Sequence, residues 1–499
     1  MKHAVGYEFL RQFCGEQALV HQPIACVGSV TRVTLVGDTL LVPATVAPQG
    51  VDLLGHLLFA LKHEGTNLAI LAQTLPQVGA QQLLAALAAA PTSSYLRVLC
   101  FLWEYFAGQT LSMAAVAKNT ATALVFDPKR YITTVQGRDA RWHVSFNGLG
   151  TLAYCATVRR TAAIEIGIAR DTLGQTQAFA AALPKPALDR ALQWAYLHET
   201  ESSFAIENEA PTQQRAQAFV HLLQQAHAPQ ELTEQQLVAL QNAVISNPHL
   251  HAVAYRSEQN WLRGPGRGAL GVSYVPPAPD LAAQLMQQLL VLARDLPRSI
   301  DPIVAASICS FGLVYIHPFM DGNGRLSRFL FHRALCQSGR LPSGLILPVS
   351  VAMQRREAEY LACLQAFSKP ARAFWQVTWV DEGQYQLEWQ GHDSLYRYWD
   401  ATACAEFGLA VAQEALEVEL QQESEFLARY DAVYSAVNAQ FDLHNNDLAT
   451  LVLSVLGNDG VLSSHRRKQF AHRVPEAAFK LLEQVAQAQS VRARSCSVA

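Results

Sequence analysis

The chain has 499 residues, of which 50% are hydrophobic and 16% are charged, and its formal net charge is −3. This length is too great for a single hydrophobic core, so we expect two to four domains. The composition is that of a globular protein and not of a disordered one. The small negative charge excludes a global positive field that would attract nucleic acid.

Cysteine usage and the N-terminal residues indicate where the protein works. Nine cysteines are scattered without a Cys-x-x-Cys pair, which predicts reduced, mostly buried thiols and neither a disulfide framework nor a zinc site. The opening residues MKHAVGYEFLRQF lack the apolar core of a signal peptide, and no run of about 18 uncharged apolar residues follows. We therefore expect a soluble, cytoplasmic protein with no membrane partner.

The first region, residues 1–184, has mixed patterns. Two β-branched runs around Gly37-Asp38 predict a hairpin within 29–46, and the apolar pattern of 51–65 predicts a helix. Short helices beside a hairpin are found in winged-helix-like DNA readers and also in structural packing domains. Because basic residues are sparse here, we favour the packing domain.

Helical patterns dominate the second region, residues 185–370. Asp301 is a predicted N-cap, with Pro302 at the first helical position. The run that follows is apolar on nearly all sides, so this helix should be central and buried. Pro318 disfavours helical geometry at His317 and should end the helix there.

The third region, residues 371–499, is predicted to be mainly helical. It opens with two aromatic-rich runs around Asp381-Glu382-Gly383, which predict a second hairpin, and a long amphipathic helix follows at roughly 401–440. A basic run, SHRRKQFAHR, occupies 464–473. We interpret it as a solvated face, with contact to nucleic acid as the alternative.

The segment IHPFMDGNGRLSR, residues 316–328, interrupts buried helical sequence with a polar, glycine-rich turn. Residues 321–324 permit tight and left-handed backbone conformations. The free N–H groups at the start of the next helix form an anion site. Arg325 and Arg328 share a face of that helix, and two guanidinium groups beside an anion site predict several phosphates.

Two more side chains of this turn can supply chemistry. Asp321 at the rim can hold Mg²⁺, which prefers a carboxylate together with substrate phosphates. His317 is the nearby group able to take up a proton near neutral pH. A DGNG sequence alone is most often a surface turn. An EF-hand is excluded because His332 stands at the acidic twelfth position, and a P-loop because no Gly-Lys dipeptide occurs.

Taken together, the residues of this turn match the signature H-x-F-x-[DE]-G-N-[GK]-R-x-x-R, and the sequence resembles the Fic family of AMP-transferring proteins. The helices of 185–370 resemble the Fic core, and the flanking regions resemble those of some long bacterial Fic proteins. The matching residues are His317, Phe319, Asp321, Gly322, Asn323, Gly324, Arg325 and Arg328.

The resemblance implies a reaction. His317 would deprotonate a Ser, Thr or Tyr hydroxyl on a target protein, and Phe319 would anchor the loop. Asp321 would hold Mg²⁺ between the α- and β-phosphates of ATP. AMP would pass to the hydroxyl and pyrophosphate would leave.

The resemblance also implies how the nucleotide is bound. Gly322, Asn323 and Gly324 would cradle phosphates, while Arg325 and Arg328 would bind the β- and γ-phosphates. Tyr360 is a candidate for packing on the base.

Residues 256–279 resemble the Fic flap, whose short hairpin pairs with an extended target segment. Such pairing would fix the register of the target by backbone hydrogen bonds. An ordinary loop ended by Pro276-Pro277 is the alternative. We place the flap strand at Val272, Ser273, Tyr274 and Val275.

The segment ESSFAIENEAP, residues 201–211, resembles the Fic inhibitory motif [ST]-x-x-x-E-[GN]. The matching residues are Ser203, Glu207 and Asn208. The resemblance implies that Glu207 pairs with Arg328 and holds the enzyme off. Without the family, the same residues are a helix end with Asn208 as a C-terminal cap and Glu207 solvated.

We therefore predict a mainly α-helical protein with a helical Fic core and a short β-hairpin flap, flanked by smaller mixed α/β regions. The predicted function is AMPylation with ATP and Mg²⁺, autoinhibited by Glu207. One alternative is removal of AMP, with Glu207 orienting water. Another is a nucleotide-sensing regulator whose flanking regions bind DNA. Self-modification and a homo-oligomer are further expectations.

Overall fold

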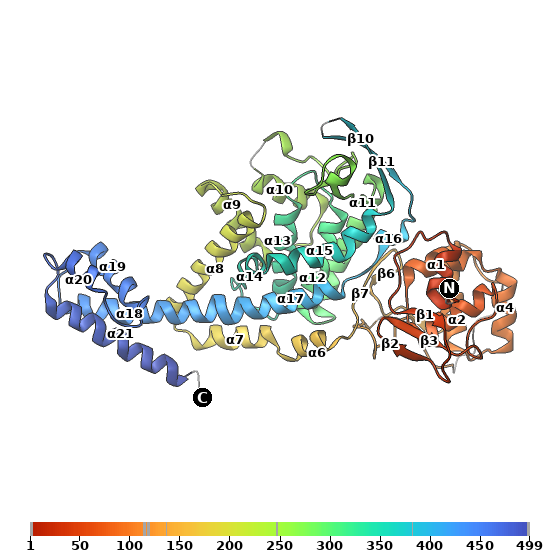
Figure 1. Cartoon of the computed structure of the whole chain (residues 1–499), viewed down its shortest axis with the longest axis horizontal. Coiled ribbons are helices and arrows are strands. Elements are labelled where there is room, and N and C mark those ends of the chain that lie inside the picture. Colours follow the sequence, from red (N-terminus) through yellow and green to blue (C-terminus); the bar gives the residue numbers. More distant parts are fainter. Residues whose placement is uncertain are drawn as a thin grey trace.

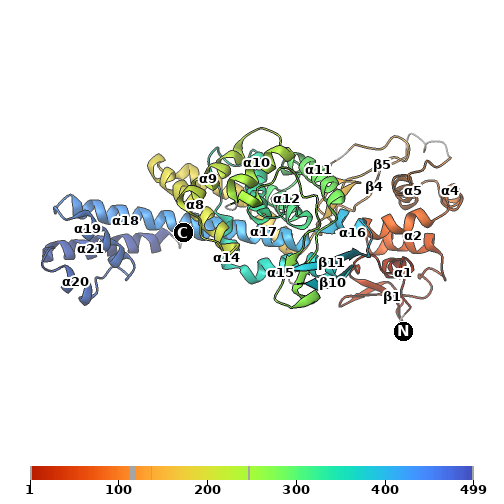
Figure 2. The same cartoon turned by 90° about the horizontal axis from the view of Figure 1, so that it is seen from above.

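The structure is a computed structural model that describes residues 3–112, 116, 120–135, 137–245, 248–381 and 383–496. The molecule is elongated, with a mixed unit at the N-terminal end, a helical centre and a small helical bundle at the C-terminal end (Figure 1). The view from above shows the same order along the long axis (Figure 2). No helix of the described residues is long and apolar enough to cross a membrane.

The N-terminal unit packs helices beside a small sheet. The predicted hairpin is confirmed, because β2 (Thr34–Val36) and β3 (Thr39–Val42) pair antiparallel around Gly37, whose φ is +58°. A third strand, β1 (Ile24–Val27), pairs parallel with β3 and was not predicted. The helices are α1 (Gly6–Phe13), α2 (Leu53–His63), α3 (Leu68–Thr74), α4 (Ala80–Ala89) and α5 (Ser94–Ala107), and a short parallel pair follows, β4 (Ala123–Leu124) with β5 (Val144–Ser145).

The helical centre is built around α12 (Pro302–Ile316), which is buried along nearly its whole length, as predicted. The carboxylate of Asp301 caps it by accepting from the backbone N–H groups of Ile303 and Val304. Around it lie α8 (Lys185–Ile206), α9 (Gln213–Gln224), α10 (Glu234–Val244), α11 (Pro279–Asp295), α13 (Asn323–Gln337), α14 (Val349–Arg355) and α15 (Glu357–Arg372).

The central core is wider than the predicted 185–370. Before it in the chain, β6 (Leu149–Thr151), β7 (Tyr154–Thr157), α6 (Ala162–Ala169) and α7 (Thr172–Ala182) contribute buried residues. After it, β12 (Tyr398–Asp400) pairs with β7, and α17 (Thr402–Glu414) lies along α12, with Phe407 in edge contact with Phe311. Both predicted boundaries therefore fall inside one hydrophobic core, because sequence-distant segments complete it.

The C-terminal part continues from α17 through a π-helical stretch, Ala415–Gln422, into α18 (Glu423–Asn438). This confirms the predicted long helix, although the π-helical stretch was not predicted. A separate apolar core joins α18 to α19 (Asn445–Leu456), α20 (Ser464–Phe470) and α21 (Glu476–Cys496).

The basic run of 464–473 lies on this bundle and is partly neutralised. Arg467 forms ion pairs with Glu476 and Glu483, and Arg473 pairs with Asp447. These pairs favour the interpretation of the run as a solvated face.

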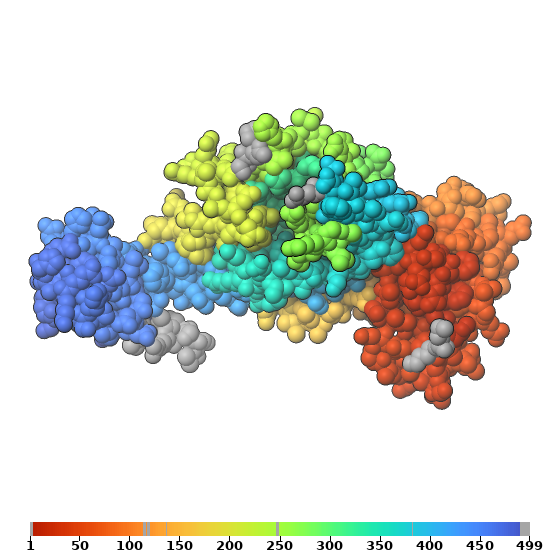
Figure 3. All heavy atoms as spheres, turned by 45° about the horizontal axis from the view of Figure 1, so that its top comes forward, coloured from red at the N-terminus to blue at the C-terminus, as the bar shows by residue number. Residues whose placement is uncertain are grey.

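Two hairpins lie side by side over the centre. The first is β8 (Leu262–Arg263) with β9 (Val272–Tyr274), and the second is the predicted hairpin of β10 (Trp375–Asp381) with β11 (Gln384–Trp389); Glu382 of its turn lies outside the described residues. The space-filling view shows the two segments in contact (Figure 3). Arg372 joins them, since its side chain donates to the carbonyl oxygens of both Val272 and Trp375.

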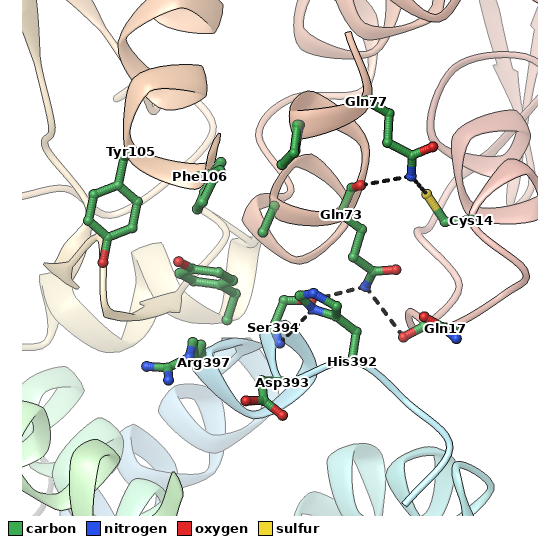
Figure 4. Close-up of a pocket in the computed structure, with 13 residues that line it drawn as sticks. Cys14, Gln17, Gln73, Gln77, Tyr105, Phe106, His392, Asp393, Ser394 and Arg397 are labelled. Atoms are coloured by element: carbon green, nitrogen blue, oxygen red, sulfur yellow. Dashed lines mark hydrogen bonds between the residues drawn. The ribbon is translucent and has the colours of Figure 1, made fainter. Parts of the chain in front are cut away.

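The N-terminal unit meets the centre at α16 (Ser394–Arg397). There Gln73 donates to the hydroxyl of Ser394, which donates in turn to the carbonyl of Ala69. A pocket of about 450 Å³ opens beside this contact, with Tyr105, His392 and Arg397 on its wall (Figure 4). None of its lining residues belongs to the turn of 316–328.

Candidate active site

The turn of 316–328 joins the end of α12 to the start of α13. His317 ends α12 with a φ of +53°, in the left-handed region, and Gly322 begins the entry into α13 with a φ of +85°. Asn323 closes the loop between them: its side-chain oxygen accepts from the N–H of Phe319 at 3.1 Å and its amide donates to the Phe319 carbonyl at 2.8 Å. The Asn323 side chain is thus used within the loop, and only its backbone N–H remains for a phosphate.

The ring of Phe319 is buried and contacts Tyr255 with 5.5 Å between ring centroids. This agrees with the predicted anchoring role. The loop is therefore held in place from inside by one amide and one aromatic ring.

His317 is held in one orientation. Its Nδ1 lies 3.2 Å from the carbonyl oxygen of Val314, so Nδ1 carries the proton and donates it, and Nε2 keeps a free lone pair. The pKa of His317 is lowered to about 4, chiefly by burial, with the charge of Arg256 acting in the same direction. The imidazole is therefore neutral at neutral pH, which is the state a general base requires.

Arg325 and Arg328 are both buried in α13, with 2% and 1% of their surface exposed. Within the described part of the chain, Nε of Arg325 and Nη1 of Arg328 are buried and have no hydrogen-bond partner. Unpartnered guanidinium N–H groups beside a helix N-terminus are donors available to an anion.

Arg328 is engaged by the end of α8, as the inhibitory motif predicts. Its Nη2 donates to Oε1 of Glu207 at 2.9 Å, and its Nε donates to the hydroxyl of Ser203 at 2.6 Å. Asn208 follows with a φ of +57°, which is the predicted left-handed end of the helix. Glu207 is therefore not merely solvated, although 36% of its side chain is exposed.

The carboxylate of Glu207 also lies directly against the start of α13. A Cβ placed on Gly324 would come within 1.9 Å of Oε1 of Glu207. The glycine therefore admits the carboxylate to the helix N-terminus, where an anionic phosphate is otherwise expected.

Arg325 has a carboxylate partner that the sequence did not reveal. Its two terminal nitrogens lie 3.2 Å from the two oxygens of Glu209, and Nη1 also donates to the carbonyl of Val244 at 3.0 Å. Its guanidinium stands 5.0 Å from the centre of the Phe204 ring. Glu209 stands outside the inhibitory motif, so no local pattern indicated this pair.

Asp321 lies at the rim, with 40% of its side chain exposed. Its carboxylate accepts from the N–H of Gly322 at 2.6 Å and stands 3.9 Å from Arg325. The described residues contain no group of three or more His, Cys, Asp or Glu side chains that could hold a metal. A single exposed carboxylate still fits Mg²⁺, because that ion takes most of its ligands from phosphates and water.

The remaining candidates lie around this loop. Tyr360 packs on Phe311 and Phe407, and burial raises its pKa to about 12. That it packs on the base stays a prediction. The flap hairpin is present, but its strand ends at Tyr274, and Val275 follows the strand as a buried residue.

The comparisons agree with this geometry. Residues 231–335 match the model of the Fic/DOC family. The protein adenylyltransferase Fic of Nematostella vectensis is 31% identical over 148 residues, which is 29% of this chain and 31% of that protein. The protein of the same name from Drosophila grimshawi is 38% identical over 88 residues, 17% of each. The chain thus spans about a third or less of the length of these curated relatives.

Among solved structures, a Fic family protein from Desulfovibrio desulfuricans G20 matches with a TM-score of 0.40 and 22% identity, over 62% of this chain and 87% of that one. Fic-1 (aa134 - 508) from C. elegans matches with a TM-score of 0.32 and 16% identity, over 74% and 99%.

The protein is mainly helical, with a histidine-and-arginine loop between two central helices. This loop lies within the matched segment, so residues 231–335 of the chain belong to a Fic domain.

Proposed function

We propose that this protein transfers AMP from ATP to a hydroxyl group of a protein, and that Glu207 holds the same site inactive. The observation that carries the proposal is the placing of Glu207. Its carboxylate lies on Gly324 at the start of α13 and is paired with Arg328, so an anion already occupies the position that the family signature assigns to phosphate.

The proposed step uses this chain's own groups as follows. The hydroxyl oxygen attacks the α-phosphorus, its proton moves to Nε2 of His317, and the bond from the α-phosphorus to the bridging oxygen breaks. Pyrophosphate leaves, with its charge held by the N–H groups of α13 and by Arg325 and Arg328. Proton transfer to a positioned base supplies about 10²–10⁴-fold, so charge stabilisation and positioning must supply the rest.

A magnesium ion is compatible with this proposed step. Asp321 would hold Mg²⁺ together with the phosphates, and the ion would neutralise part of their charge.

A second candidate function uses the same site in the opposite direction. Glu207 lies near enough to His317 for its charge to act to raise the pKa of that histidine, and 36% of its side chain is exposed. A carboxylate there can orient a water molecule that removes AMP from a modified protein. Incubating an AMPylated protein with the wild type and with Glu207→Gly distinguishes the two, because only removal needs the carboxylate.

The DNA-binding alternative stays a prediction. Filter binding to DNA fragments at several salt concentrations tests it, since binding through phosphates weakens steeply as salt rises.

The proposed function is tested by incubating lysate proteins with ATP labelled at the α-phosphate and with the Glu207→Gly chain. Mass spectrometry should find AMP on Ser, Thr or Tyr. The double variant with His317→Ala is the control and should leave lysate proteins unlabelled. Equal labelling by both chains would refute the proposal.

A further inference from the structure

Arg256 is the first residue of the flap segment 256–279, ahead of its hairpin, and is 7% exposed. Its Nε donates to the carbonyl of His317 at 2.8 Å, its Nη1 donates to the carbonyl of Glu258 at 3.0 Å, and its Nη2 donates to the carbonyl of Pro277. Its own backbone N–H donates to the carbonyl of Pro318 at 2.8 Å. No motif singled out this residue in the sequence.

These partners belong to three separate parts of the site. His317 carries the proposed base, while Glu258 and Pro277 flank the flap hairpin on its two sides, so one guanidinium ties both ends of the flap to the catalytic loop. Two further hydrogen bonds also join the flap segment to the end of α12 and the loop after it. Asn260 donates to the carbonyl of Phe319 at 3.4 Å, and the hydroxyl of Tyr274 donates to the carbonyl of Tyr315 at 2.7 Å.

The bond to His317 matters because that residue has a left-handed backbone, which is unfavourable for a residue with a side chain. A planar guanidinium presents its donors in a fixed fork, so it holds several carbonyl groups in one arrangement. A lysine at this position would offer one ammonium group on a flexible stem and could not bridge the same distances.

We propose that Arg256 is a positioning residue for AMP transfer, which fixes the distance between His317 and the target segment that the flap carries. This inference rests on the proposed function. Misplacing reacting groups by about 1 Å costs on the order of 10²-fold in rate. Loss of Arg256 should therefore lower the rate of transfer while leaving the phosphate-binding groups of α13 in place.

The charge of Arg256 gives a second, independent readout. Burial lowers the pKa of Arg256 to about 10, so the group is a cation at neutral pH. Its charge lowers the pKa of His317, whereas the charges of Glu207 and Asp321 act to raise it. Removing the cation should move the protonation of His317 to higher pH.

The experiment compares Arg256→Lys and Arg256→Gln, each in the Glu207→Gly chain, with Arg97→Gln as the matched control. Arg97 is also buried, with 2% of its surface exposed, and donates to two backbone carbonyls, those of Trp142 and His143, in the N-terminal unit. The measurements are incorporation of AMP into lysate proteins against pH, ATP affinity by calorimetry, and melting temperature.

Both Arg256 variants should lose about 10²-fold in rate per folded molecule with unchanged ATP affinity. Arg256→Gln should also move the acid limb of the pH–rate profile to higher pH. Arg256→Lys keeps the positive charge, so its acid limb should stay at the same pH. The control should lower only the melting temperature. Rates of AMP transfer equal to that of the Glu207→Gly chain in both Arg256 variants would overturn the inference. A loss of rate that parallels a fall in melting temperature, with the acid limb of the pH–rate profile unchanged, would overturn it as well. If the Glu207→Gly chain with Arg256 intact transfers no AMP, the proposed function is overturned and this inference with it.

A separate observation carries a second inference, about Arg325. Both oxygens of Glu209 lie 3.2 Å from its terminal nitrogens, so the pair is bidentate. Glu209 follows the end of α8 and is 34% exposed on its side chain, with Arg215 at 3.8 Å as its only other cationic partner among the described residues.

We infer that Glu209 is a second inhibitory carboxylate, which competes with a phosphate of ATP for Arg325 just as Glu207 competes for Arg328. This second inference also rests on the proposed function. Release of Glu207 alone would leave one phosphate-binding arginine occupied, so full activation requires that both carboxylates leave. AMP has no β- or γ-phosphate and should not compete with Glu209.

The test measures the affinities of ATP and AMP by calorimetry for the wild type, Glu207→Gln, Glu209→Gln and the double variant. Glu201→Gln is the control, because Glu201 lies near the end of α8, shortly before both carboxylates in the sequence, and is exposed. Glu209→Gln should tighten ATP by a factor within the range of about 5–150 that is typical of regulated sites, and leave AMP unchanged. Equal ATP affinity for Glu209→Gln and the wild type would overturn the inference. If Glu207→Gln also leaves ATP affinity unchanged, the proposed inhibition by Glu207 fails as well.

Discussion

Replacing Glu207 by glycine should raise AMP transfer and self-modification. The carboxylate and Arg328 are 2.9 Å apart and the arginine is 1% exposed. Two unit charges near 4 Å attract by about 4 kcal/mol at an effective dielectric constant of 20. Because 36% of the Glu207 side chain is exposed, solvent screens the pair and the net coupling is smaller.

A coupling of about 1–3 kcal/mol, typical of regulated sites, corresponds to roughly 5–150-fold activation. Glycine also removes the carboxylate that lies against Gly324, so it should free both Arg328 and the start of α13. Glu207→Gln keeps the size and loses the charge, and should therefore activate less. Arg328→Ala should not activate, because it deletes a phosphate ligand together with the ion pair.

The assay is incorporation of labelled AMP by the wild type and these three variants at matched protein and ATP concentrations. Glu201→Gly is a control for helix destabilisation, since Glu201 is exposed on α8. If Glu207→Gly is no faster than the wild type, residues 203–208 are a capped helix end without an inhibitory role. Equal activation by Glu201→Gly would assign the effect to a loosened helix and not to the freed arginine.

Three further predictions concern the loop itself. His317→Ala should abolish AMP transfer and leave ATP affinity by calorimetry nearly unchanged, because the imidazole handles only the proton; substantial residual transfer would remove it from the role of base. Asp321→Ala should flatten the Mg²⁺ dependence of the rate, and an unchanged Mg²⁺ titration would mean that this carboxylate does not hold the ion. The acid limb of kcat/KM in the Glu207→Gly chain should lie well below 6.5, since burial lowers the pKa of His317 to about 4 and the base works only when neutral. A limb near 6.5 would contradict the burial of that ring.

Helix ends and turns were predictable from the sequence wherever residues close together in the chain determine them. Asp301 caps α12, Pro318 ends it at His317, and Gly37 turns the N-terminal hairpin, each through contacts a few residues apart. The turn of 316–328 was predictable for the same reason, because its histidine, glycines and arginines fall within twelve residues.

The contact between Glu207 and Arg328 was predictable only by resemblance. Nothing in residues 201–211 states that Glu207 faces Arg328, which lies 121 positions away in the sequence. The resemblance to the family motif supplied the expected pairing of Glu207 with Arg328, and the two side chains are in contact in the structure.

Other features were decided by the tertiary structure alone. An apolar pattern shows that α17 has a buried face but not that it packs along α12, and so the predicted boundary at 370 cuts through a continuous core. Likewise Glu209 looks like a solvated residue beyond a helix end, and Arg256 like one more surface cation. Each meets its partner only when the chain returns from a distance, because the residue type sets the charge of a side chain, whereas the fold sets its burial and its partner.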